Sequence, residues 1–467
     1  MIKIAKKWIG FITIAAVLTS AIYLTVSAND YNNEYEKAGL VIEKFSVDIS
    51  EECYDPKVGI SVMSCGSNGM YVCIRNNVTL SDRYLFVDYA GNTYERDAGL
   101  PAIFSDGIAA INTDGVISTW DNNDNYGYID ENYNWIREPG NHIVSSASEG
   151  YVLIGDKGKQ FLLDYNGRPC FAADRFCYNS PLSVTEIGKV FSGGKAVCEK
   201  NDQFCFVDKE LNCVELAAKT GGWESCDYSG GTAVITKSKP DDHAVNTEKY
   251  ISEMYNSAGT CVYKHELSVR DDEYDSSIMF PKVLSNGYAI FPKKDNDAAS
   301  ENQQNKFSKY DLIMVSPDGE EIATTDKDFR VSNLQSLGAN VLFDELGGIC
   351  YDMSFGKLLE PNDRNIYCCD LNGDVAVAAK QDEAAREKVV LEFTVIHPRE
   401  VELNRTVRVV DPDKVKPVAG KNEVLTDCIC IDNEAVSFNL PPIEENDRTL
   451  VPMRRIFEEL DAIVTWD

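Results

Sequence analysis

The sequence predicts an all-β fold assembled from repeated antiparallel units. A Ser-x-Gly pattern recurs along the chain, and a second pattern, two apolar residues followed by Asp, recurs between its copies. Signals for helices are sparse, since apolar residues rarely recur with a helical period. With 467 residues, 44% of them hydrophobic and 10% aromatic, the chain is long enough for a large repeat array and too apolar for wholesale disorder.

The N-terminus predicts export. Three lysines, Lys3, Lys6 and Lys7, precede an uncharged apolar run, which ends at the small residues of Val26-Ser27-Ala28. This order is typical of a signal peptide, although the run is also long enough for a spanning helix. We therefore expect residues 1–28 to be a signal peptide cleaved after Ala28 or, as the alternative, a retained membrane anchor. Both place the rest of the chain outside the cell or at its surface.

The Ser-x-Gly pattern is followed by an apolar residue two positions after the glycine. The glycines of the successive copies are Gly69, Gly107, Gly150, Gly194, Gly231, Gly287, Gly338 and Gly373. The last two copies are weaker, because Asn340 fills the apolar position of one and Leu371 replaces the serine of the other. Glycine can adopt the positive φ that a tight turn requires. The steps between glycines are 38, 43, 44, 37, 56, 51 and 35 residues, and polar insertions at 237–249 and 293–306 account for the two longest.

The second pattern predicts a turn at the end of a strand. It reads Phe86-Val87-Asp88, Tyr128-Ile129-Asp130, Leu162-Leu163-Asp164 and Phe206-Val207-Asp208, often with Gly three residues after the Asp, and it is weaker in later copies. Asp bonds the backbone of a type I turn, and Gly relieves strain at its exit. Each unit of about 40 residues is therefore a small antiparallel meander that must bury one face on its neighbours.

Seven or eight such units suit a β-propeller, with an open β-solenoid as the alternative. We expect a ring to be closed by a late strand, residues 389–396, pairing with an early one. The predicted organisation is a lead-in at 29–57, the repeat array at 58–410, a linker at 411–424 and a small α+β half domain at 425–467.

Two stretches carry a resemblance to the WG repeat. Phe104 to Ile111, "FSDGIAAI", and Tyr126 to Ile136, "YGYIDENYNWI", follow its order, although the Trp-Gly dipeptide survives only as Tyr126-Gly127. The resemblance covers about residues 60–390 and is that of a degenerate array. It implies a bacterial β-repeat interaction module, not an enzyme.

The C-terminal segment combines a hairpin with a helix. Asp432-Asn433 is a turn between two short strands, and Pro452 precedes an apolar helical face. Asp447 to Arg454, "DRTLVPMR", and Val464 to Asp467, "VTWD", resemble the stalk domain named after the N-terminus of copper amine oxidase. That resemblance implies an accessory module of exported bacterial proteins. Residues 428–467 contain no His, so copper chemistry is not expected there. The family's pattern continues beyond Asp467, so we expect a truncated half domain that could self-associate.

Cysteine and histidine positions predict no catalytic or metal site. The 15 cysteines include strand positions such as Cys73, Cys198, Cys205 and Cys350, which favours buried free thiols over disulfides. The four histidines are widely spaced and are expected in exposed loops. No spacing matches a catalytic, cofactor or metal motif, so none of these sites is assigned.

The best candidate for ligand binding is the stretch 120–135. Trp120, Tyr126, Tyr133 and Trp135 could stack on sugar rings, and the neighbouring Asp and Asn side chains could bind Ca²⁺. The alternative is a loop with core aromatics and solvated acids.

The sequence as a whole predicts a non-catalytic, exported binding protein at the cell surface. The formal net charge of -30 opposes binding to nucleic acid or anionic lipid, so a protein or an envelope glycan is the expected partner. Contact with a membrane is expected only through an uncleaved N-terminal segment. The alternatives are a glycan-binding module and an exported hydrolase with a site in the propeller funnel.

Overall fold

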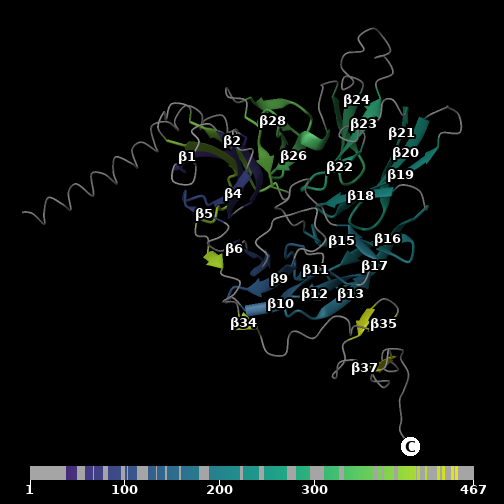
Figure 1. Ribbon diagram of the computed structural model, residues 1–467. Coiled ribbons are helices and arrows are strands. Elements are labelled where there is room, and N and C mark those ends of the chain that lie inside the picture. Colours follow the sequence, from purple (N-terminus) through teal and green to yellow (C-terminus); the bar gives the residue numbers. More distant parts are fainter. Residues whose placement is uncertain are drawn as a thin grey trace, which may run out of the picture.

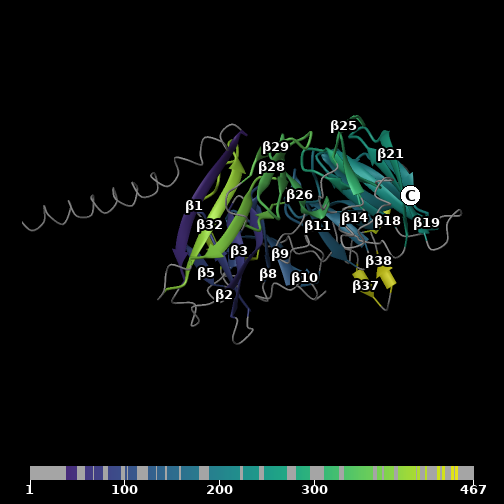
Figure 2. The same ribbon diagram turned by 90° about the horizontal axis from the view of Figure 1, so that it is seen from above.

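The described part of the chain forms a closed ring of antiparallel sheets, a β-propeller of eight blades. The computed structural model describes residues 38–49 and 58–410, apart from loop segments of which the longest are 113–124, 178–188, 271–279 and 295–309, and short strands between 416 and 450. Figure 1 views the ring along its axis. In this view the first strand of each blade lies toward the middle of the ring, and the later strands lie toward the rim. Figure 2 shows the ring from its side. The predicted propeller is confirmed, and the open solenoid is excluded.

Blades 1 to 4 follow one another along the chain. Blade 1 consists of β2 (Val58–Gly66), β3 (Gly69–Asn76), β4 (Asp82–Val87) and β5 (Thr93–Glu95). Blade 2 consists of β7 (Phe104–Ser105), β8 (Ile108–Asn112), β9 (Asn125–Asp130) and β10 (Asn134–Asn141). Blade 3 consists of β11 (Tyr151–Asp156), β12 (Lys159–Asp164) and β13 (Pro169–Ala173). Blade 4 consists of β14 (Arg175–Cys177), β15 (Lys195–Lys200), β16 (Gln203–Asp208) and β17 (Cys213–Ala218).

Blades 5 to 8 complete the ring. Blade 5 consists of β18 (Glu224–Ser229), β19 (Thr232–Pro240), β20 (Thr247–Tyr255) and β21 (Cys261–Arg270). Blade 6 consists of β22 (Lys282–Val283), β23 (Ala289–Lys294), β24 (Tyr310–Val315) and β25 (Glu321–Thr325). After the short 3₁₀ helix η4 (Val331–Asn333), blade 7 consists of β26 (Leu334–Leu337), β27 (Val341–Asp344), β28 (Ile349–Asp352) and β29 (Lys357–Leu359). Blade 8 consists of β30 (Cys368–Cys369), β31 (Ala376–Gln381), β32 (Val390–Pro398) and β1 (Leu40–Asp48).

The ring is closed by pairing the two ends of the array. β1 pairs antiparallel with β32 from Leu40 opposite Pro398 to Asp48 opposite Val390. β1 comes from the segment that the sequence sets apart as a lead-in, and β32 covers the predicted closing strand at 389–396 except for its first residue. This pairing ties the first strand of the described chain into the last blade, so the two ends of the array cannot separate without breaking the sheet of blade 8. The expected pairing of late with early strands is confirmed.

Short strands outside the blades belong to the C-terminal region, except for one that lies between blades 1 and 2 in the chain. They are β6 (Leu100–Ala102) paired with β33 (Arg408–Val410), β34 (Lys416–Pro417) parallel to β10, and the hairpins β35 (Ile429–Ile431) with β36 (Glu434–Val436) and β37 (Ile443–Glu445) with β38 (Arg448–Leu450). The first hairpin flanks Asp432-Asn433, as expected from the sequence. The predicted helix after Pro452 lies outside the described residues. No helix in the described part of the chain has the length and apolar content of a membrane span, and residues 1–28 are not among those described.

Each Ser-x-Gly copy marks the turn between the first and second strands of one blade, except in blade 3, where the turn directly precedes β11. All of their glycines have positive φ, between 68° and 104° except for the more extended Gly69 at 147°. The turns of neighbouring blades touch. Ser148 Oγ accepts a hydrogen bond from Phe191 N (3.0 Å), and Ser192 Oγ accepts one from Gly230 N (2.9 Å). The repeated serine thus hydrogen-bonds one blade to the next. The spacing of the repeat in the sequence does not reveal this role.

The second pattern forms the turn between the last two strands of a blade. Asp88 Oδ1 accepts hydrogen bonds from the backbone N of Ala90 (2.9 Å) and Asn92 (2.8 Å). The same pair of bonds, to the residues two and four positions on, recurs at Asp130, Asp164 and Asp352. The predicted role of the Asp side chain is confirmed, and the repeat unit is the propeller blade.

An ionic contact spans the ring closure at the rim of blade 8. Arg405 Nη2 lies 2.7 Å from Glu43 Oε2, and His397 Nε2 lies 3.8 Å from Glu43 Oε1, too far for a hydrogen bond. The His397 imidazole and the Arg405 guanidinium lower the pKa of Glu43 to about 2, against the opposing effect of desolvation. Glu43 is on β1 and Arg405 follows β32, so the ion pair links β1 to the segment that follows its partner strand.

We expect Arg405→Met to lower the free energy of unfolding by about 0.5–1 kcal/mol at pH 7, the range for partly exposed ion pairs. Because the pKa of Glu43 is lower in the folded than in the unfolded chain, its contribution is present above pH 4.5 and is lost as the pH falls toward 2. Urea unfolding at pH 7, 5 and 3 measures this difference. The Glu43→Gln background is the control: an undiminished effect of Arg405→Met there would show that the contact is not electrostatic.

Candidate functional site

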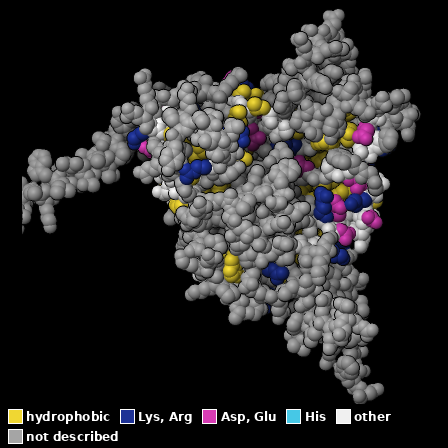
Figure 3. Space-filling model, in the orientation of Figure 1, with side chains coloured by type: hydrophobic (Ala, Val, Ile, Leu, Met, Phe, Trp, Pro, Cys, Tyr) yellow, Lys and Arg dark blue, Asp and Glu magenta, His cyan; other side chains and the backbone are white. Residues whose placement is uncertain are grey.

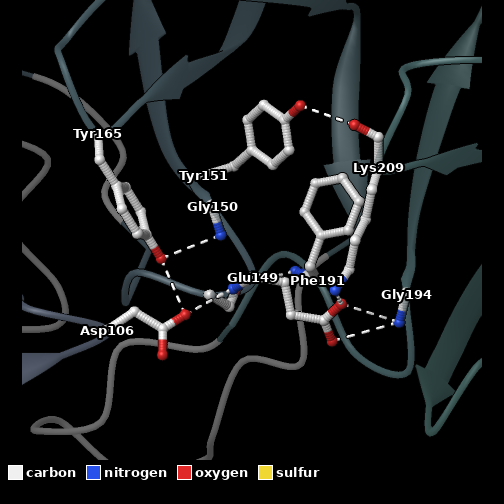
Figure 4. A network of polar contacts seen from close by, with 9 residues as sticks. Asp106, Glu149, Gly150, Tyr151, Tyr165, Phe191, Gly194 and Lys209 are labelled. Carbon is white, nitrogen blue, oxygen red and sulfur yellow. Dashed lines mark hydrogen bonds and ion pairs between the residues drawn. The ribbon is translucent and has the colours of Figure 1, made fainter.

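The Ser-x-Gly turns of blades 2, 3 and 4 form a polar network on one face of the ring, shown in Figure 4. Asp106 Oδ2 accepts hydrogen bonds from Glu149 N (2.8 Å) and from the Tyr165 hydroxyl (2.9 Å). Glu149 in turn accepts a hydrogen bond from Gly194 N (2.9 Å) and forms an ion pair with Lys209 Nζ (2.9 Å). These contacts join turns of three blades, so the network holds these blades together at one face.

Charged side chains gather instead on the inner strands of the later blades. Asp227, on β18, and Lys282, at the start of β22, are half-buried. Both strands lie toward the middle of the ring (Figure 1). Asp227 Oδ2 accepts a hydrogen bond from Val283 N (2.8 Å), and Lys282 Nζ donates one to Ser332 O (3.1 Å). Val283 N of blade 6 thus contacts the Asp227 carboxylate of blade 5, and the positive charge of the preceding residue, Lys282, acts to lower the pKa of that carboxylate.

Glu345 brings a second carboxylate to Lys282. It lies in the turn between β27 and β28 of blade 7, and its Oε1 accepts a hydrogen bond from Cys369 N of blade 8 (3.0 Å). Desolvation raises the pKa of Glu345 and of Asp227, and it lowers the pKa of Lys282, while the opposite charges act against these shifts. Burial therefore opposes the charged form of each group, and mutual attraction offsets this only in part.

A third element of the cluster is the acid pair of blade 8. Asp370 is 4% exposed, follows β30 directly, and its Oδ1 accepts a hydrogen bond from Asp374 N (2.7 Å). Desolvation and the neighbouring Asp374 raise the pKa of Asp370 to about 7, and the charge of Lys189 from blade 4 acts in the opposite direction. Desolvation also raises the pKa of Asp374, and the charge of Lys189 opposes this shift, so a lysine of blade 4 faces acids of blade 8, on the opposite side of the ring.

The axial charge cluster, as we call it, consists of Lys189, Asp227, Lys282, Glu345, Asp370 and Asp374. Its members come from five blades and combine half-buried carboxylates with ammonium groups. Such a set could hydrogen-bond hydroxyl groups, bind a charged ligand, or exchange a proton near neutral pH. Within the residues that the structure describes, no group of three or more His, Cys, Asp and Glu is arranged to hold a metal ion.

We expect Asp370→Asn to stabilise the protein by at least about 1 kcal/mol more at pH 8 than at pH 4. The pKa of Asp370 is higher in the folded than in the unfolded chain, so the wild type loses stability as the pH rises from about 4 through about 7. Asn keeps the acceptor oxygen but has no proton to lose. Thermal unfolding at the two pH values measures the difference, and an equal effect at both would argue against a raised pKa.

The aromatic residues that the sequence singles out do not converge on this cluster. Trp135, on β10, is 6% exposed and pairs with Ile129 of β9 in the register of blade 2. Its indole ring is buried within blade 2 and is not accessible to a ligand in solvent. Tyr126 lies on β9, while Trp120 and Tyr133 fall outside the described residues. A binding role for Trp120, Tyr126 and Tyr133 stays a prediction.

The expected positions of two histidines were wrong. His397 lies on β32 and is 5% exposed, and His265 lies half-buried on β21 with Nε2 2.6 Å from Pro292 O. His142 and His243 are not among the described residues. The expectation of buried free thiols is confirmed for Cys73, Cys198, Cys205 and Cys350, whereas Cys368 is only half-buried and Cys213 is exposed.

Sequence reasoning missed the axial charge cluster, although one signal pointed to it. Lys189 and Lys282 each stand three residues before the serine of a Ser-x-Gly copy, and Asp227 stands two residues before one. These positions fall on the inner strand of a blade. A charge there, in a position that apolar or small residues fill in other copies, marks a residue near the ring axis.

The fold and the match of one segment define the class of this protein. The chain is an eight-bladed β-propeller with a C-terminal segment outside the ring. Residues 430–467 match the family model of the copper amine oxidase N-terminal domain, which confirms the resemblance drawn from the sequence of that segment. No curated protein sequence matches the chain significantly.

Solved structures that resemble the chain are propellers of low sequence identity. Hsv2 of Kluyveromyces lactis is 9% identical with a TM-score of 0.30, over 70% of this chain and 95% of that one. The oligogalacturonate lyase of Vibrio parahaemolyticus is 12% identical with a TM-score of 0.29, over 78% and 98%. Puromycin hydrolase is 10% identical with a TM-score of 0.34, over 76% and 55%. At this level the comparisons say nothing about activity.

Proposed function

We propose that this chain is an exported, non-catalytic binding protein of the bacterial cell surface. Its propeller recognises a protein or an envelope glycan, and the C-terminal module related to the copper amine oxidase N-terminal domain serves attachment or assembly. The repeat array is a degenerate relative of WG repeats. The signal-like segment at residues 1–28 and the match at 430–467 support export and an accessory role for the C-terminus.

The observation that carries the binding function is the axial charge cluster. Half-buried Asp227, Lys282 and Glu345 lose hydration, and their mutual attraction only partly offsets this loss. A purely structural ring would be more stable with apolar residues in these places. A partner that brings hydroxyl groups or countercharges to the cluster would complete its hydrogen bonds and offset the lost hydration.

The experiment is a glycan array of envelope and plant polysaccharide fragments, with envelope proteins as a second panel, probed with the full chain. Binding by the wild type that falls at least tenfold in Lys282→Met and in Asp227→Asn supports the proposal. Lys380→Met, an exposed lysine paired with Glu392 at the rim of blade 8, is the matched control and should bind normally. Binding that is indifferent to both cluster variants would refute the assignment to the ring axis.

A second candidate, an exported hydrolase, is favoured by one feature. Asp370 has a raised pKa beside a second carboxyl group, as a general acid requires. The same arrays assayed for product formation distinguish the two functions. Turnover that Asp370→Asn abolishes would identify an enzyme and overturn the non-catalytic proposal.

A further inference from the structure

Three cysteines of blade 4 lie on three adjacent strands and on the same face of the sheet. Cys198 of β15 is directly opposite Cys205 of β16. Cys213 of β17 is opposite Val207, two residues from Cys205 and therefore on its side of the sheet. Cys198 and Cys205 are buried, with exposures of 0% and 3%, whereas Cys213 is exposed on the outer strand. The exposed thiol of Cys213 thus lies on the same face of the sheet as the buried thiols of Cys198 and Cys205.

The surroundings of Cys213 favour its thiolate. The thiols of Cys198 and Cys205 interact with its sulfur and lower its pKa, and the charge of Lys200 acts in the same direction against desolvation. The pKa of Cys198 is raised in turn, first by its hydrogen bond with Cys205. Figure 3 shows acidic and basic side chains exposed over β16 and β17, so this part of the surface is accessible to small charged molecules.

We propose that Cys213, Cys205 and Cys198 form a thiol–disulfide exchange site on the outer edge of blade 4, with a small-molecule disulfide as the oxidant. Cys213 is the attacking thiol, and Cys205, on the neighbouring strand, is the resolving thiol. Cys198, on the neighbouring strand β15, does not take part in the exchange, and its thiol interacts with those of Cys205 and Cys213. This inference does not rest on the proposed binding function, since the site is at the rim of the ring and not at its axis.

The reaction balances in two exchange steps. The Cys213 thiolate attacks one sulfur of the small disulfide, forms a mixed disulfide and releases the first thiolate. The Cys205 thiol then loses its proton to solvent and attacks Cys213 Sγ, which releases the second small thiolate. Two protein thiols are oxidised to one disulfide, and one small disulfide is reduced to two thiols.

The test uses the reduced full chain, oxidised glutathione as the probe, and peptide mapping by mass spectrometry after alkylation. We expect a Cys205–Cys213 disulfide in the wild type, a trapped Cys213–glutathione adduct in Cys205→Ala, and no disulfide in Cys213→Ser. Cys198→Ala should still form the Cys205–Cys213 bond. A wild type that stops at the mixed disulfide, or that links Cys213 to another cysteine, would overturn the proposal.

The control is Cys170, a half-buried thiol of blade 3, whose pKa is raised by desolvation. At pH 6.5, alkylation of Cys213 should be about tenfold faster than alkylation of Cys170, since a thiol of ordinary pKa is largely protonated there. Both rates come from the folded wild type, so this comparison stands even if a cysteine variant fails to fold. Equal rates would contradict an activated Cys213.

Discussion

Replacing Gly193 with alanine is expected to lower the free energy of unfolding by about 3 kcal/mol or more. Gly193 has a φ of 63°, and a Cβ on it would lie 2.4 Å from Gly231 N and 2.5 Å from Gly230 C. These are backbone atoms of the adjacent turn, which cannot rotate away. The substitution therefore combines the cost of a left-handed alanine with a steric separation of blades 4 and 5.

The neighbouring glycine supplies the control for this prediction. Gly194 has a φ of 77°, but a Cβ on it would meet no atom within 4 Å. Gly194→Ala should therefore cost only the conformational term, about 1 kcal/mol. Urea unfolding of both variants, followed by intrinsic fluorescence, measures the difference. Similar losses in the two variants would show that the contact between blades does not limit stability.

Replacing Phe393 with alanine should destabilise the protein by about 3–5 kcal/mol, the range for a fully buried phenylalanine. Phe393, on β32, is 1% exposed, and its ring stacks on that of Phe45 on β1 with centroids 5.0 Å apart. It belongs to the core between blades 8 and 1, with Val72, Leu85 and Val377. The cavity would thus open where the two ends of the array meet.

The matched control lies one residue away on the same strand. Glu392 pairs with Lys380 at 3.4 Å, and both side chains are exposed by more than 40%. Glu392→Gln should change stability by less than about 1 kcal/mol. Thermal unfolding and limited proteolysis near β1 provide the readout. If Phe393→Ala were no worse than Glu392→Gln, the closure would not depend on this packing.

Most of the blade could be predicted because its signals are local. The Ser-x-Gly and Asp turns act through contacts within about four residues, such as the bonds from Asp88 to the backbone of Ala90 and Asn92. The period of the turns, corrected for insertions, identified the repeat unit. The sequence also located the closing strand, because residues 389–396 follow the last recognisable copy.

The candidate site could not be predicted because its parts are distant in sequence. Asp227, Lys282, Glu345 and Asp370 span more than a hundred residues, and each is unremarkable in its own segment. The aromatic stretch 120–135 stood out by composition, yet Trp135 is buried in blade 2. The type of a side chain in the sequence indicates which ligands it can bind, but only the tertiary structure determines whether that side chain is exposed to solvent.

The sequence by itself determined the β class, the meander of about 40 residues, its turn chemistry and the resemblance of the C-terminal segment to a known domain. Only the tertiary structure decided that the array closes as a ring of eight blades, because closure depends on the pairing of Leu40–Asp48 with residues about 350 positions away. It also decided which charges meet near the axis and which thiols share a face of blade 4. Turn formation is local, whereas closure and burial depend on how every blade packs on its neighbours.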